Sequence, residues 1–164
     1  MSDLSNKTYT METEFELIAK TFQGLENVLA KELTDLGANN IQTGRRMVSF
    51  TGDKELMYRA NFALRTAIRI LKPIKHFKAE SADQVYDAVK AIDWNQYLNN
   101  ETSFAVDSVV FSQEFRHSKF VAYKVKDAIV DYFREKTGSR PNISVTHPDL
   151  QLISILQKTT VRCR

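Results

Sequence analysis

The stretch FELIAKTFQGLENVLAKELTDLG, residues 15–37, changes its hydrophobic period part of the way along. At its start, Phe15, Leu17 and Ala19 alternate with polar residues, which is typical of a half-buried strand. Further on, leucine and valine recur at the three- and four-residue spacing of a helix, and Gly37 is a typical helix stop. The stretch therefore predicts a strand followed by an amphipathic helix, which begins a mixed fold of helices and strands.

The next segments extend this pattern. Residues 40–53 read as two short strands with a turn at Gly44, and Asp53 is a suitable N-cap for the helix that follows. Residues 68–79 alternate again, although Pro73 predicts an edge strand or a bulged one. The resulting order, strand, helix, strand, strand, helix, strand, predicts a ferredoxin-like βαββαβ arrangement.

The second half of the chain has a different order of elements. It predicts helix, strand, helix, strand, strand, and Gly138 is placed to end the longer helix. The overall fold class is therefore α+β, a ferredoxin-like subdomain followed by an α/β domain. The expected elements are a helix after Ser81, a strand over 104–111, a long helix over about 118–136, and strands over 142–147 and 150–156.

The charged residues are segregated along the chain although the net charge is only +3. Residues 59–78 hold six basic and no acidic side chains, residues 80–114 hold seven acids and one base, and residues 115–164 hold ten bases and four acids. Such blocks favour a polyanionic partner more than the mean charge does. The alternative is that the blocks interleave in space and cancel.

Motifs for self-contained catalysis are missing from the sequence. Its five glycines are too far apart for a dinucleotide or phosphate loop, its three histidines are scattered, and Cys163 is the single cysteine. We expect no cofactor, metal or catalytic residue in this chain. One cysteine suits a reducing, cytoplasmic location, and no apolar run is long enough to span a membrane.

The start of the long helix is the first candidate binding site. Ser118 is expected to cap the helix, leaving free backbone N–H groups, and Arg116 stands just before it. Lys119 and Lys126 fall on one edge of the apolar arc, away from the acids of this helix. Phosphate binding and an ordinary capped, solvated helix remain equal alternatives here, and His117 alone reads as a loop residue.

Other basic residues are dispersed over both halves of the chain. Dispersed cations suit duplex RNA, which is recognised mostly through its phosphates and 2′-hydroxyls. Solvated surface is the alternative for each residue singly. The further candidates for RNA contact are Arg45, Arg46, Arg65, Arg69 and Arg140.

Several segments together resemble a known family. FELIAKTFQGLENVLAKELTDLGA, RTAIRILKPI, IDW and FRHSKFVAYKVKDAIVDYFREKTGSRPNISVTHPDL are similar to the N-terminal region of bacterial ribosomal RNA large-subunit guanine-N2 methyltransferases. These enzymes carry a ferredoxin-like segment, a THUMP domain and a catalytic domain that uses S-adenosylmethionine. The resemblance implies an RNA-binding, substrate-recruiting module for a guanosine of 23S ribosomal RNA, with the C-terminal methyltransferase domain and its S-adenosylmethionine missing from this chain.

The resemblance also gives expected domain boundaries. Residues 1–13 would be a flexible lead, 14–79 the ferredoxin-like domain, and 80–164 a THUMP domain truncated at its C-terminal end. THUMP domains also occur in transfer RNA 4-thiouridine synthetases, so such an enzyme is one alternative. A protein-interaction or structural module is the other.

Overall fold

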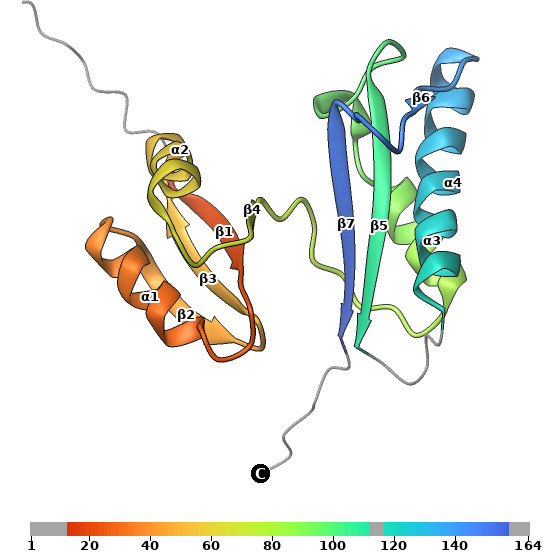
Figure 1. Ribbon diagram of the computed structural model, residues 1–164. Helices are drawn as coiled ribbons and strands as arrows, with labels where there is room; N and C mark the ends of the chain where they lie inside the picture. The colour runs from red at the N-terminus through yellow and green to blue at the C-terminus, as the bar shows by residue number, and fades with distance from the viewer. Residues whose placement is uncertain (1–12, 112–116, 158–164) are drawn as a thin grey trace, which may run out of the picture. The chain divides into compact units, whose positions relative to one another are not determined.

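The computed structural model describes residues 13–111 and 117–157, and these residues form two compact units that divide after His76. Each unit has a β-sheet of its own. The sheet of the first unit is antiparallel, whereas the sheet of the second is parallel. The two units of the chain therefore differ in the relative direction of their paired strands (Figure 1).

The first unit is a four-stranded sheet in the order β2-β3-β1-β4, with two helices packed on one face. In sequence it reads βαββαβ, so the ferredoxin-like prediction is confirmed. Figure 1 shows this unit in red to yellow. Its elements are β1 (Phe15–Lys20), α1 (Glu26–Asp35), β2 (Asn39–Gly44), β3 (Met47–Gly52), α2 (Lys54–Ala63) and β4 (Arg69–Leu71).

The core of this unit lies between the sheet and the two helices. Alternate residues of β1 and β3 point into it, as the strand pattern predicts, and Asp53 caps α2 by accepting from the Leu56 backbone N–H at 2.7 Å. Phe50 is 1% exposed at its centre. The buried core residues are Leu17, Ala19, Leu29, Leu33, Val48, Phe50, Leu56 and Ala60.

Two details of the first unit differ from the sequence prediction. The β2–β3 turn is Arg45–Arg46, because Gly44 still pairs with Met47, and Arg46 takes the left-handed conformation with φ of 58°. The Glu26 carboxylate holds this turn by accepting from the Arg46 backbone N–H at 3.0 Å. The strand predicted around Pro73 is limited to the three residues of β4, at the edge of the sheet.

The second unit is a three-stranded parallel sheet in the order β6-β5-β7, covered by two helices. Figure 1 shows α3 and α4 on the same side of β5 and β7. A single 3-10 turn, η1 (Trp94–Gln96), precedes β5. The other elements are α3 (Ala82–Lys90), β5 (Ser103–Phe111), α4 (Ser118–Thr137), β6 (Asn142–Ile143) and β7 (Leu150–Gln157).

The sequence predicted caps at three helix ends of the second unit, and two of them are observed where they were predicted. Ser81 caps α3 by accepting from the Gln84 N–H at 3.3 Å, and Gly138 ends α4 with a left-handed φ of 71°. The predicted cap of α4 is wrong by one residue. His117 occupies the N-cap position without a side-chain cap bond, and Ser118 is the first helical residue.

The strand predicted over 150–156 is confirmed, since β7 spans Leu150–Gln157, whereas β6 departs from prediction. β6 has only two residues, because the chain then crosses the start of β5, where Ser144 N–H donates to Phe104 C=O and Asp149 N–H to Ser103 C=O. In β7, Leu152 and Leu156 are the buried side chains. In the part of the chain that the structure describes, no helix combines the length and apolar character needed to cross a bilayer.

Candidate functional site

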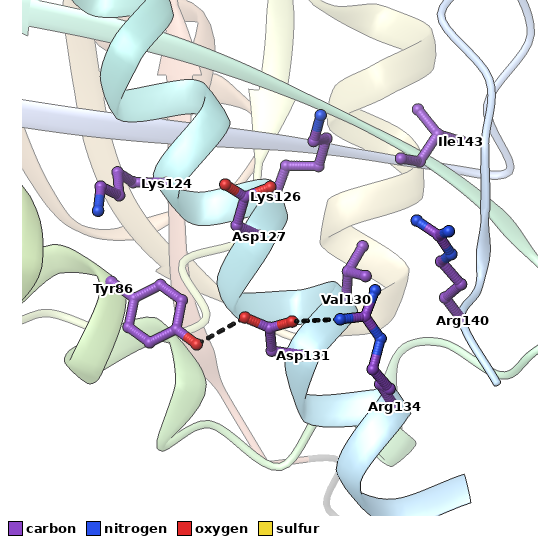
Figure 2. Close-up of a pocket in the computed structure, with 9 residues that line it drawn as sticks. All are labelled: Tyr86, Lys124, Lys126, Asp127, Val130, Asp131, Arg134, Arg140 and Ile143. Atoms are coloured by element: carbon purple, nitrogen blue, oxygen red, sulfur yellow. Dashed lines mark hydrogen bonds and ion pairs between the residues drawn. The ribbon is translucent and has the colours of Figure 1, made fainter. Parts of the chain in front are cut away.

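A hollow in the second unit lies along α4 and has a volume of about 530 Å³. Tyr86 of α3 borders it on one side, and Arg140 and Ile143 border it on the other (Figure 2). Four of its side chains are cationic and two are anionic, so the lining is net positive. The α4 residues that line it are Lys124, Lys126, Asp127, Val130, Asp131 and Arg134.

Asp131 organises one side of this α4 hollow. Its carboxylate accepts from the Tyr86 hydroxyl at 2.8 Å and lies 3.5 Å from an Arg134 guanidinium nitrogen (Figure 2). The hydrogen bond to this carboxylate, followed by burial, raises the pKa of Tyr86. Lys124 is engaged as well, since its ammonium lies 3.2 Å from the Asp83 carboxylate.

Lys126 and Arg140 are the two hollow cations for which the described part of the chain supplies no such partner. Among the described residues, no carboxylate lies within ion-pair distance of either side chain. The Lys126 ammonium instead lies 5.1 Å from the centre of the Tyr123 ring, and Arg140 is exposed in the loop before β6. An unpaired cation loses no protein partner when it binds phosphate, so these two are the best placed to bind it.

The residues predicted at the start of α4 are only partly described. His117, Ser118 and Lys119 are all exposed on the first turn. Arg116 lies outside the described residues, so its role stays a sequence prediction. Since His117 takes the cap position without a side-chain bond, the phosphate-binding hypothesis at this end depends on the exposed Lys119 side chain rather than on Ser118.

A second cationic group lies in the first unit, and we call it the strand-end cluster: Lys20, Arg46 and Arg69. Lys20 of β1 pairs directly opposite Arg69 of β4, and the Thr21 N–H donates to the Arg46 carbonyl at 3.0 Å. Burial and the charge of Arg46 lower the pKa of Lys20. Like charges placed opposite each other are destabilising, so an anion bound here would relieve their repulsion.

The two other predicted arginines of this unit are exposed in loops. Arg45 lies in the β2–β3 turn beside Arg46. Arg65 follows α2, where its backbone N–H donates to Glu32 at 3.4 Å. The Glu32 carboxylate binds Thr66 through the hydroxyl at 2.6 Å and the backbone N–H at 3.2 Å. Arg65 therefore stands beside an acid, as Arg46 of the strand-end cluster stands beside Glu26.

Three cations of these sites were not among the sequence candidates: Lys20, Lys124 and Arg134. Lys20 is the last residue of an ordinary strand, and only pairing between β1 and β4 brings it opposite Arg69. Lys124 projects to the acidic side of α4 on a helical wheel, and only the neighbouring α3 shows that Asp83 offsets its charge. For Arg134, its place in the basic C-terminal block was the available signal.

The fold and these sites define a class of protein: a two-unit α+β chain with cationic surfaces on each unit. Two family matches specify the class further. Residues 16–71 match the RlmL ferredoxin-like domain, and residues 79–161 match the THUMP domain. The chain belongs to the THUMP domain family.

Two relatives share the ribosomal RNA large subunit methyltransferase K/L name. One, from Marinomonas sp. (strain MWYL1), is 36% identical over 98% of this chain and 21% of its own length. The other, from Syntrophotalea carbinolica, is 39% identical over 87% of this chain and 20% of its own length. The chain thus spans about a fifth of the length of these relatives.

A solved structure extends the comparison to three dimensions. The crystal structure of a protein from Listeria monocytogenes, described as a predicted N6-adenine-specific DNA methylase, has a TM-score of 0.74 and 29% identity. The match covers 88% of this chain and 38% of that one. The resemblance of the sequence to the ferredoxin-like and THUMP region of ribosomal RNA methyltransferases is therefore confirmed.

Proposed function

We propose that this chain is the RNA-binding, substrate-recruiting part of a methyltransferase that acts on large-subunit ribosomal RNA. The single observation that carries the proposal is the α4 hollow of the THUMP unit, where Lys126 and Arg140 have no carboxylate partner among the described residues. Both 36% and 39% identical relatives bear the name of such an enzyme. The nucleotide would be a guanosine of 23S ribosomal RNA, modified at N2.

Methyl transfer itself would belong to a catalytic domain outside this chain. That domain would bind S-adenosylmethionine, the methyl donor, because this sequence has no glycine-rich cofactor loop. The described residues offer a positively charged surface that holds and orients RNA. Action on ribosomal RNA also agrees with the cytoplasmic location suggested by the single cysteine.

Binding to RNA through Lys126 and Arg140 can be measured directly. Fluorescence anisotropy with transcribed fragments of 23S ribosomal RNA, over a salt series, compares the wild type with Lys126→Gln and Arg140→Gln. Each substitution is expected to weaken binding and to reduce the salt slope by about one. Lys31→Gln and Lys54→Gln, exposed lysines on α1 and α2, are controls with the same charge change.

The results separate the proposal from its alternatives. Equal losses for the hollow and control variants would mean that general charge, not this site, binds RNA. Tighter binding to transfer RNA than to ribosomal RNA fragments would favour a thiouridine synthetase module. A stable oligomer in light scattering together with no RNA affinity would favour the protein-interaction module.

A further inference from the structure

Two aromatic rings stand exposed on the first turns of α4. Phe120 is 52% exposed and Tyr123 is 58% exposed, although the same helix buries Phe133 to 1% exposure. Residues three positions apart are neighbours on a helix surface, so both side chains leave the helix from adjacent positions outside its apolar arc. Exposing two large rings next to each other is unfavourable in water, which suggests a ligand for them.

A lysine that lines the α4 hollow lies over each ring. The Lys124 ammonium lies 5.8 Å from the centre of the Phe120 ring, and the Lys126 ammonium lies 5.1 Å from the centre of the Tyr123 ring. Such contacts hold a positive charge next to an aromatic face. A ligand that matches this surface must therefore combine flat π-faces with closely spaced negative charges, as a nucleic acid strand does.

We propose that Phe120 and Tyr123 form a stacking platform for unpaired bases of an RNA strand, with Lys126 binding the phosphates beside them. The inference rests on the proposed RNA-binding function and makes the ligand more specific. In a duplex, both faces of every internal base are already stacked, so an external ring can stack only on a base from a loop, bulge or end. The platform therefore selects single-stranded RNA, unlike the duplex expected from dispersed cations.

The strand would continue from the platform into the α4 hollow. Lys124 and Lys126 contact the rings and also line that hollow, so the two surfaces are continuous. Bases stacked on the rings would place the following phosphates toward Arg140, an exposed cation on the side of the α4 hollow opposite Tyr86 (Figure 2). An uncharged peptide would match the rings but not the cations, so the charge of the surroundings favours the polyanion.

The test compares single-stranded and duplex RNA of one length. A fluorescently labelled 12-nucleotide oligoadenylate and a 12-base-pair RNA duplex are titrated with the wild type, Phe120→Leu and Tyr123→Leu. Leucine keeps an apolar side chain but removes the ring, and circular dichroism checks the fold. Each substitution should weaken single-strand binding about tenfold and leave duplex binding within twofold.

A 2-aminopurine base in the same oligonucleotide reports stacking itself, because its fluorescence changes when a ring stacks on it. That change is expected with the wild type and should be lost in Phe120→Leu/Tyr123→Leu. The matched control is Tyr58→Leu/Phe62→Leu, the same two residue types exposed at 61% and 96% on α2. Among the described residues no lysine lies over either control ring, so this pair should have no effect.

Each contrary outcome has its own meaning. If the wild type binds RNA but the platform variants lose nothing, or lose single strand and duplex equally, the stacking inference is overturned while RNA binding stands. Equal losses in the α2 control would overturn it too, because the rings would then be interchangeable. No binding to either RNA by the wild type would overturn the proposed function as well.

Discussion

The Tyr86 hydroxyl donates a hydrogen bond of 2.8 Å to the Asp131 carboxylate, joining α3 to α4. The same carboxylate lies 3.5 Å from Arg134, so one acid both ties two helices together and offsets a cation of the hollow. Asp127, the other acid of the hollow, is exposed and has no such role among the described contacts. We therefore expect Asp131 to affect both stability and RNA binding, and Asp127 to affect RNA binding alone.

Asp127→Asn should tighten RNA binding by about three- to fivefold at low salt, because one negative charge is removed from the surface proposed to bind phosphates. Asp131→Asn should tighten binding similarly but also lower the free energy of unfolding by about 1 kcal/mol, since Tyr86 loses its charged acceptor. Anisotropy and urea unfolding measure the two effects. Weaker RNA binding in both variants would contradict the assignment of the hollow.

Arg69→Gln in the strand-end cluster should have effects of opposite sign on binding and on stability. RNA affinity should fall a few-fold, whereas the free energy of unfolding should rise by a few tenths of a kcal/mol, because Lys20 loses the like charge opposite it. The same two measurements apply, with Arg59→Gln on α2 as the control. A loss of both affinity and stability would indicate that Arg69 has only a packing role.

Asp149 should make folding sensitive to acid. Its carboxylate accepts from the Ser103 N–H at 2.8 Å and from the Ser103 hydroxyl at 2.7 Å, and these bonds lower the pKa of Asp149 below its usual 3.8. The stabilisation is therefore present above about pH 3.8 and is lost as the pH falls through the folded-state pKa.

Asp149→Asn should accordingly lower the melting temperature at pH 7, and the difference from the wild type should disappear as the pH falls below 3.8. Thermal unfolding followed by circular dichroism from pH 7 to pH 3 measures this. Asp87→Asn, an exposed acid on α3, is the control. A difference that stays constant down to pH 3 would mean that shape, not charge, matters at this position.

Gly138→Ala should cost about 1 kcal/mol of folding free energy, because the C-cap of α4 has a left-handed φ of 71° that alanine adopts poorly. An added Cβ would meet no atom within 4 Å, so the cost is conformational rather than steric. Gly138→Asn tolerates this conformation better and should lose less. Equal losses in urea unfolding would refute the conformational explanation.

Local features of the sequence predicted most of the fold. Asp53 and Ser81 cap the helices assigned to them, because a cap bond reaches only three residues along the chain. β6 was predicted too long, because residues 144–149 must cross the start of β5 before β7 begins. That crossing depends on β5 lying between β6 and β7, which no local pattern records.

The candidate site could be predicted less completely. Lys126 and Arg140 were named from the sequence, and the structure adds that both line one hollow without an acidic partner among the described residues. Lys20 was missed, because its relation to Arg69 exists only after β1 pairs with β4. Phe120 and Tyr123 were missed as well, since an aromatic residue in an amphipathic helix is usually expected in the core.

By itself, the sequence determined the order of helices and strands, two helix caps, the α+β class and the family resemblance, because these depend on residues near one another in the chain. Only the tertiary structure decided which charges are paired and which rings are exposed. Lys124 forms an ion pair with Asp83, the Tyr86 hydroxyl donates to Asp131, and Lys20 lies opposite Arg69 in paired strands. Each of these contacts joins elements that are far apart in the sequence. The charge pattern of the surface follows from those contacts, because electrostatic energy depends on distance in space rather than in sequence.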